Sequence, residues 1–209
     1  MNSSEKDYEA LVGLYKDWNS RINVISRKDI DNIYSHHILH SLAIAEYLRS
    51  FYPEGVWDGA SVLDLGTGGG FPGIPLAMNF PAAHFVLCDS VGKKITVASA
   101  VSKAMGLNNV ECVNARAESL GRTFDWVVSR AVTTLENFYP WVKGRFNRSI
   151  LYLKGGDVET EMQELSRKYH IESGKMRAWS IKEWLDDDYF AEKFVIEIGK
   201  DYLCPPVFE

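Results

Sequence analysis

The sequence predicts an α/β protein with a Rossmann-like, doubly wound and mostly parallel sheet, preceded by a helical N-terminal extension. Two observations predict this class. Short β-rich runs alternate with helix-length segments from residue 60 onward, and the first run leads directly into a glycine-rich turn. Such alternation is typical of parallel sheets covered by helices on both faces. With 209 residues, 46% of them hydrophobic, the chain can bury the core of one such domain.

The first fifty residues are expected to be helical. Apolar residues recur at helical spacing over residues 4–18 and 30–50, and Pro53 and Gly55 end this part of the chain. We therefore expect residues 1–57 to form an extension packed on the core and residues 58–209 to form the α/β domain itself. We find no internal repeat, low-complexity tract or flexible linker that would separate independent domains.

The remaining elements follow in regular order. Helices are expected between the strands, over segments such as 91–105 and 157–168. The expected strands are short runs rich in Val, Ile, Leu and Phe: Ser61–Leu65, His84–Cys88, Asn109–Val113, Asp125–Ser129, Ile150–Leu153 and Phe194–Ile198.

Composition argues against several classes of protein. Charged residues interrupt the first thirty positions, and no later run is long and apolar enough to span a bilayer, so we expect a soluble, cytoplasmic protein with no membrane partner. Cys88, Cys112 and Cys204 are too few and too scattered for a disulfide framework or a zinc site. Buried, reduced thiols are expected instead.

The net charge of −5 limits nucleic-acid binding to local basic clusters, because Lys and Arg neutralise phosphates. Each cluster is equally compatible with an ordinary solvated surface. The candidates are Arg21, Arg27 and Lys28; Lys93 and Lys94; and Lys143, Arg145 and Arg148.

The segment from Val62 to Pro75 reads as a strand, a glycine turn and the start of a helix. Glycines permit positive φ and close approach of a ligand to the backbone, at the carboxyl end of the strand where such sheets bind cofactors. A GxGxxG pattern fits Gly68, Gly70 and Gly73. That pattern alone leaves open a nicotinamide dinucleotide or S-adenosylmethionine (SAM).

The prolines favour a cofactor without phosphates. A pyrophosphate is held by free N–H groups at the start of the following helix, and Pro72 and Pro75 remove two of those donors. Asp64, just before the first glycine, can face the cationic methionine part of SAM, or it can accept hydrogen bonds from the glycine loop. Both roles are compatible with each other.

Asp89 ends the second strand about 20 residues after the glycine turn, the separation at which this kind of sheet offers a carboxylate to ribose hydroxyls. The alternative is that Asp89 or Ser90 caps the helix that begins near Val91. The combination with the glycine turn favours the ribose role.

With these residues in place, the chain resembles the bacterial small-subunit ribosomal RNA guanine-N7 methyltransferase G family, also called glucose-inhibited division protein B. The resemblance covers most of the chain, and the last two segments make it specific. The matching segments are Trp18-Asn19, Ile22-Asn23, His37-Ile38-Leu39, Ser41-Leu42, Asp64 to Pro75, Asp89-Ser90, Lys93-Lys94, Arg116-Ala117-Glu118, Phe124 to Ala131 and Lys154-Gly155.

The resemblance implies a class I SAM-dependent methyltransferase that methylates N7 of a guanosine in the 530 loop of 16S rRNA. Its partner would be 16S rRNA or a small ribosomal subunit particle, with no obligate protein partner evident. It implies SAM contacts at Gly66, Gly68, Phe71, Asp89, Ala117, Glu118 and Arg130. We further expect catalytic roles for Arg130 and Lys154, which would hold phosphate or guanine O6, and RNA contacts at Lys93, Lys94, Arg116 and, from the basic clusters, Arg145.

One segment departs from the family pattern. The usual Arg-His-Ile-Leu-Asp-Ser element appears as His36 to Ser41, with histidine at the first and fifth positions. These histidines suggest a metal site at first sight, but no HExxH arrangement or placed acidic ligand accompanies them. We expect no metal, and for His36 and His40 a place on a helix surface or between helices.

The chemistry of the target predicts the mechanism. N7 of guanine carries a free lone pair, so it can attack a sulfonium methyl group without first losing a proton. The protein then has to position the base and exclude water, and no catalytic base is required. Two other functions remain open: an NAD-dependent oxidoreductase on the same fold, and a noncatalytic ribosome-assembly factor.

Overall fold

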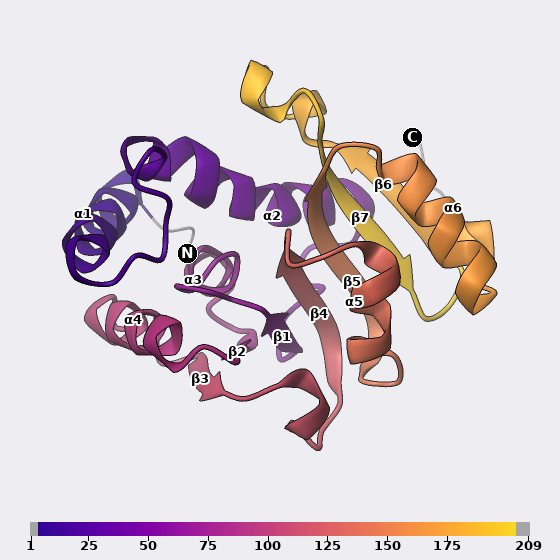
Figure 1. Ribbon diagram of the computed structural model, residues 1–209, viewed down its shortest axis with the longest axis horizontal. Coiled ribbons are helices and arrows are strands. Elements are labelled where there is room, and N and C mark those ends of the chain that lie inside the picture. Colours follow the sequence, from indigo (N-terminus) through magenta and orange to yellow (C-terminus); the bar gives the residue numbers. More distant parts are fainter. Residues whose placement is uncertain (1–3, 204–209) are drawn as a thin grey trace.

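The computed structural model describes residues 4–203, and the C-terminal residues 204–209, to which the sequence assigns no role, lie outside them. One mostly parallel sheet of seven strands forms the centre (Figure 1). Its order is β3-β2-β1-β4-β5-β7-β6, and β7 runs antiparallel to both of its neighbours. The strands are β1 (Ser61–Leu65), β2 (His84–Asp89), β3 (Val110–Asn114), β4 (Phe124–Arg130), β5 (Phe146–Gly155), β6 (Met176–Ser180) and β7 (Lys193–Gly199).

Helices cover both faces of this sheet, so the predicted doubly wound architecture is confirmed. In Figure 1 the sheet separates α2 to α4 from α5 and α6. Short 3-10 turns lie at Ile30–Asn32 (η1), Ala117–Ser119 (η3), Ser173–Lys175 (η4), Ile181–Glu183 (η5) and Asp188–Phe190 (η6). The longer helices are α1 (Glu5–Arg21), the π-helix η2 (Ile33–Leu39), α2 (His40–Phe51), α3 (Gly73–Asn79), α4 (Gly92–Ala104), α5 (Leu135–Val142) and α6 (Val158–Tyr169).

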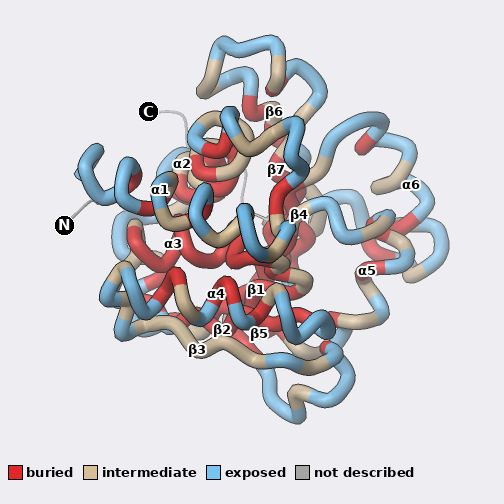
Figure 2. The backbone as a smooth tube through the Cα atoms, turned by 60° about the vertical axis from the view of Figure 1, so that its left-hand side comes forward, coloured by how far each residue is buried: buried red, intermediate tan, exposed pale blue. Residues whose placement is uncertain are grey.

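Alternate residues of the central strands build two hydrophobic layers. In β4, Trp126 and Val128 face the layer beneath α2 to α4, whereas Val127 between them faces the layer beneath α5 and α6. Successive side chains of a strand point to opposite faces, so a strand covered on both sides is apolar throughout. Figure 2 shows this burial concentrated on the central strands.

The N-terminal helices share the first of these layers. Leu11 and Tyr15 of α1 are fully buried, and α1 contacts both α4 and η2. The hydroxyls of Tyr47 and Tyr52, on and just after α2, donate to the two carboxylate oxygens of the buried Glu197 of β7. The extension is therefore anchored to the sheet, and its division from the rest at residues 57 and 58 stays a prediction.

The edge strand β6 was not predicted, and the helix α5 was expected only as one of the helical segments between strands, without bounds. β5 also begins earlier than expected, at Phe146. The expected helix over residues 30–50 is divided into η1, η2 and α2. Within residues 4–203, none of the helices combines the length and apolarity required to span a membrane.

Candidate active site

The glycine turn lies where the sequence places it, between the end of β1 and the start of α3. Gly66 and Gly68 have φ values of +73° and +59°, which L side chains rarely adopt. A Cβ at Gly66 would also lie 2.6 Å from a methyl group of Val132. A Cβ at Gly68 would meet nothing within 4 Å, so the backbone at Gly68 borders open space that a ligand can approach.

Five of the six amides from Gly66 to Phe71 are already used inside the protein. At the start of α3, the Gly73 amide donates to Asp64 and the Ile74 amide to the Gly70 carbonyl, whereas Pro72 and Pro75 have no N–H. The first turn of α3 therefore offers no free donor to a pyrophosphate. Within the loop, internal acceptors also take the amides of Gly66, Thr67, Gly68, Gly70 and Phe71.

Asp64 fixes the glycine loop from inside, as one of its two predicted roles required. Its Oδ2 accepts hydrogen bonds from the Thr67 hydroxyl at 2.6 Å and from the Gly73 amide at 2.7 Å. Its Oδ1 is buried and has no hydrogen-bond partner within the described part of the chain. Burial raises the pKa of this carboxyl to about 7, against the lowering effect of those two hydrogen bonds.

Asp89 connects the glycine turn to the end of β2. Its Oδ2 accepts the amide of Gly68 and its Oδ1 accepts the amide of Val91. The cap of α4 is Val91 itself, so Asp89 does not occupy the capping position. A carboxylate has about four acceptor positions. Two of them therefore remain for further donors.

A cavity of about 580 Å³ opens at the carboxyl ends of β1, β2, β3 and β4. It is lined by five of the seven predicted cofactor residues, Gly66, Asp89, Ala117, Glu118 and Arg130, and by two predicted RNA residues, Lys94 and Arg116. The sequence did not single out Val132 and Trp141, which also line it. Parallel strands present their carboxyl ends at one edge, which explains why residues so far apart in sequence meet here.

Two predicted cofactor residues do not line this cavity. Gly68 is connected to the cavity only indirectly, because its amide donates to Asp89, which lines it. Phe71 is buried, with 4% of its surface exposed. The Phe71 ring lies 4.5 Å from the ring of Tyr15, and the Arg130 guanidinium lies 5.1 Å from its centre. The ring of Phe71 therefore packs against the guanidinium of Arg130. A contact between Phe71 and a cofactor stays a prediction.

The guanidinium of Arg130 is held by the N-terminal extension. One terminal nitrogen lies 2.9 Å from Nδ1 of His37, and the other donates to the His36 carbonyl at 3.4 Å. Arg130 also lines the cavity. The structure therefore places the predicted catalytic arginine between the extension and the cavity.

Lys154 lies in a different environment. Its ammonium forms an ion pair of 2.8 Å with Glu161 and donates to the Thr133 carbonyl at 3.0 Å. The Tyr152 hydroxyl accepts the amides of Val132 and Thr133 in the same loop. Lys154 and Tyr152 together hold the loop that follows β4, and a direct role of Lys154 in the reaction stays a prediction.

The predicted RNA-binding residues fall into two groups. Lys94 and Arg116 line the cavity, and Arg145 lies at its rim, where its guanidinium donates to the Glu118 carbonyl at 3.0 Å. Lys93 is exposed on α4 and does not line the cavity. RNA binding by all four stays a prediction.

The histidines form contacts that the sequence did not indicate. His36 and His37 are on the π-helix, and each places a ring nitrogen on the carboxylate of Asp29. His36 also stacks on Tyr189, with ring centres 3.5 Å apart. His40 is 6% exposed and packs between helices. No group of three or more His, Cys, Asp or Glu side chains in residues 4–203 is arranged to hold a metal.

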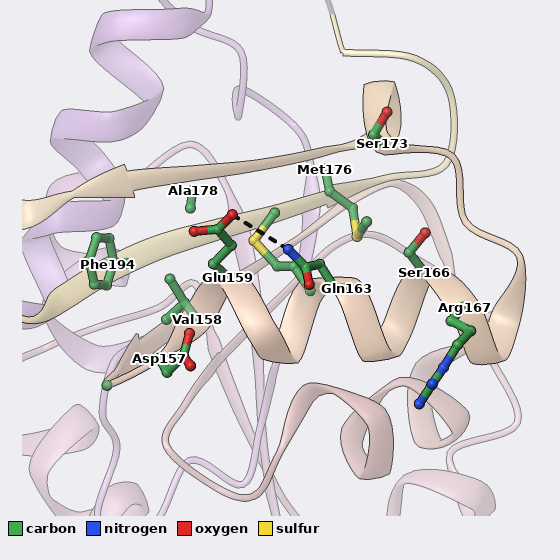
Figure 3. A pocket seen from close by; sticks show the side chains of 12 residues that line it. Asp157, Val158, Glu159, Gln163, Ser166, Arg167, Ser173, Met176, Ala178 and Phe194 are labelled. Atoms are coloured by element: carbon green, nitrogen blue, oxygen red, sulfur yellow. Dashed lines mark hydrogen bonds between the residues drawn. The ribbon is translucent and has the colours of Figure 1, made fainter.

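A second cavity, of about 750 Å³, lies between α6 and the edge strand β6 (Figure 3). Apolar side chains such as Met162, Met176 and Phe194 line it, and Gln163 donates to Glu159 along α6. None of the predicted site residues lines this cavity. Its lining also includes the charged side chains of Asp157, Glu159 and Arg167.

The chain is similar to known proteins over most of its length. A family model described as "rRNA small subunit methyltransferase G" (GidB) matches residues 4–184. The ribosomal RNA small subunit methyltransferase G of Flavobacterium psychrophilum is 45% identical over 199 residues, which cover 91% of this chain and 88% of the relative. The corresponding protein of Porphyromonas gingivalis is 46% identical, over 91% and 85%.

Solved structures share the fold at low sequence identity. The magnesium protoporphyrin IX methyltransferase of Synechocystis with bound SAM has a TM-score of 0.65 and 15% identity, and covers 96% of this chain and 100% of its own. A Thermus thermophilus 16S rRNA N2 G1207 methyltransferase, in complex with AdoMet and guanosine, has a TM-score of 0.57 and 19% identity, over 87% and 45%. The fold is therefore that of the SAM-dependent methyltransferases.

Proposed function

Because the chain belongs to the rRNA small subunit methyltransferase G family, we propose that it transfers a methyl group from SAM to N7 of a guanosine in the 530 loop of 16S rRNA. One observation carries the proposal. The cavity of about 580 Å³ brings together, from four strand ends, five of the seven residues that the family resemblance assigns to the cofactor. Its volume lies in the range of small-molecule sites.

The residues around the cavity fit SAM. Asp89 has acceptor positions left that would take the ribose hydroxyls, and Ala117 and Glu118, which line the cavity, would lie beside the adenine. Gly66 of the glycine turn lines the cavity, and the internally bonded amides of this turn suit a cofactor without phosphates. Arg130 would lie near the reacting end.

SAM supplies the reaction with a methyl group on a positively charged sulfur. N7 would take this methyl group through its lone pair as the carbon–sulfur bond breaks, so that neutral S-adenosylhomocysteine leaves and the positive charge passes to the methylated guanine. Because N7 carries no proton, no side chain has to act as a base. The work of the chain is to align N7 and to replace water with fixed dipoles. Arg130 would hold guanine O6 or a flanking phosphate, for which the guanidinium fork offers two parallel donors.

Basic residues beside the cavity would seat the RNA. Lys94 and Arg116 line it, and Arg145 is fixed at its rim, so these residues would neutralise phosphates near the target base despite the net charge of −5. Lys93 would contact a more distant phosphate, and Lys154 would act from the loop after β4. A ribosomal substrate of this kind places the enzyme in the cytoplasm.

Mass spectrometry of 16S rRNA from cells lacking the gene tests the proposal. Loss of one methyl group from a guanosine of the 530 loop is expected, and its restoration by the intact gene. In vitro, the purified chain should bind SAM and not NADH, and it should methylate either naked 16S rRNA or 30S particles. Binding of NADH would point to an oxidoreductase. Binding of SAM without methyl transfer to either RNA would point to a noncatalytic assembly factor.

A further inference from the structure

A chain of hydrogen bonds leads from the loop after α1 to the guanidinium of Arg130. Oδ2 of Asp29 lies 2.7 Å from Nε2 of His37, and Nδ1 of the same ring lies 2.9 Å from a terminal nitrogen of Arg130. The side chains of His37 and Asp29 are 14% and 29% exposed, so water only partly screens these contacts.

The two partners of His37 determine which ring nitrogen carries the proton. A guanidinium can only donate, so Nδ1, which faces Arg130, must present a lone pair. The neutral ring then carries its proton on Nε2, where the ionised carboxylate of Asp29 accepts it. Asp29 therefore selects the single tautomer of His37 that can accept a hydrogen bond from Arg130.

The local backbone is suited to this arrangement. Residues Ile33–Leu39 form a π-helix, a rare helix type found frequently at functional sites. It lets the successive residues His36 and His37 both reach Asp29, through the Nδ1 of one ring and the Nε2 of the other. The His36 carbonyl is also within reach of the second terminal nitrogen of Arg130.

We propose that Asp29 and His37 are positioning residues for methyl transfer, which hold the Arg130 guanidinium in one orientation toward the cavity without touching the substrate. This inference rests on the proposed function and on the role of Arg130 in it. Arginine has many rotamers, so ordering its guanidinium costs conformational entropy. If the guanidinium is already ordered before the substrate binds, less entropy is lost when the reaction geometry forms. Phe71 supports the same guanidinium through its ring face.

Four variants of the full chain test the inference. Asp29→Ala removes the carboxylate, and His37→Leu removes the acceptor that faces Arg130. His37→Asn restores an acceptor oxygen near the position of Nδ1. Asp31→Ala is the matched control, because Asp31 lies two residues from Asp29 but its carboxylate pairs with Lys16 at the surface.

Single-turnover methylation, SAM affinity and thermal unfolding would be measured for each. Asp29→Ala and His37→Leu should lower the rate per folded molecule by about ten-fold or more, with SAM affinity changed by less than about three-fold. His37→Asn should recover part of the rate, and Asp31→Ala should match the wild type. If Asp29→Ala does not fold, the two His37 variants decide the question.

Nitrogen NMR of the SAM-free wild type gives a readout independent of activity. Nδ1 of His37 should show the signal of an unprotonated ring nitrogen, and Nε2 that of a protonated one. A protonated Nδ1, or a wild-type rate in His37→Leu, would overturn the inference while the proposed function stands. A wild-type chain that methylates neither naked 16S rRNA nor 30S particles would overturn the proposed function first, and this inference with it.

Discussion

The backbone amide of Gly68 donates a hydrogen bond of 2.9 Å to Oδ2 of Asp89, and this bond ties the glycine turn to the end of β2. The same carboxylate is the proposed acceptor for the ribose of SAM. Asp89→Ala should therefore weaken SAM binding by ~1.5 to 3 kcal/mol for each charged hydrogen bond lost, as measured by calorimetry.

A matched carboxylate controls for loss of stability. Asp125 also accepts a backbone amide, that of Ser61, but at the opposite end of the sheet. Asp125→Ala should lower the melting temperature and leave the dissociation constant of SAM unchanged. Equal SAM affinity in Asp89→Ala and the wild type would exclude Asp89 from the cofactor site.

The second prediction concerns the buried carboxyl of Asp64. Its folded-state pKa is raised from 3.8 to about 7, so its contribution to stability is fully present below pH 3.8 and is lost as the pH rises toward 7. The SAM-free wild type should lose up to a few kcal/mol of unfolding free energy over that window, relative to Asp64→Asn. Urea unfolding of both proteins at several pH values measures the difference. Parallel pH profiles would show that Asp64 titrates normally.

Much of this site follows from local patterns. The glycine turn, Asp64 and Asp89 lie on strands whose apolar runs and spacing mark them in the sequence, and parallel strands bring their ends to one edge. The strand β6 could not be predicted in this way. It is an edge strand in which only Trp179 is buried, so its sequence has no alternating apolar pattern.

Contacts between distant segments explain the rest. Pro140 indicates a break in a helix, because proline has no N–H to donate to the carbonyl four residues earlier. The helix α5 nevertheless continues through Pro140, and the Tyr169 hydroxyl donates to that carbonyl, which belongs to Glu136. The contact of Arg130 with His37 spans 93 residues. No local pattern reports such a pair, and the adjacent histidines of η2 were the only visible signal.

The third prediction separates two roles of Lys154. Lys154→Met should destabilise the chain by ~1.5 to 3 kcal/mol, because Glu161 loses its charged partner, and should also lower turnover. Glu161→Gln breaks the same ion pair but keeps the ammonium. If Lys154 acts on the RNA, Glu161→Gln should retain most of the turnover per folded molecule. An equal loss in both variants would restrict Lys154 to holding the loop after β4.

The fourth prediction uses the salt dependence of RNA binding. Arg145→Glu should reduce the slope of log affinity against log salt concentration by about one, if Arg145 meets a phosphate. Arg49→Glu is the control, because Arg49 pairs with Glu46 and lies beside Pro53, away from the cavity. Filter binding over a range of salt concentrations measures both. Identical slopes would assign Arg145 to ordinary surface.

The last prediction tests the mechanism through pH and Arg130 together. Burial and the charge of Arg130 lower the pKa of His37 to about 4, so this ring is neutral above that value and its lone pair remains available to the guanidinium. N7 needs no deprotonation, so single-turnover methylation should show no rising limb near neutrality, and its rate should fall only as the pH drops toward 4. Arg130→Ala should lower the rate more than SAM affinity, and Arg130→Lys should restore little, because a point charge cannot reproduce a bidentate fork. A rate that follows one essential ionisation near pH 7, or full activity in Arg130→Lys, would instead require a general base and a different role for the arginine.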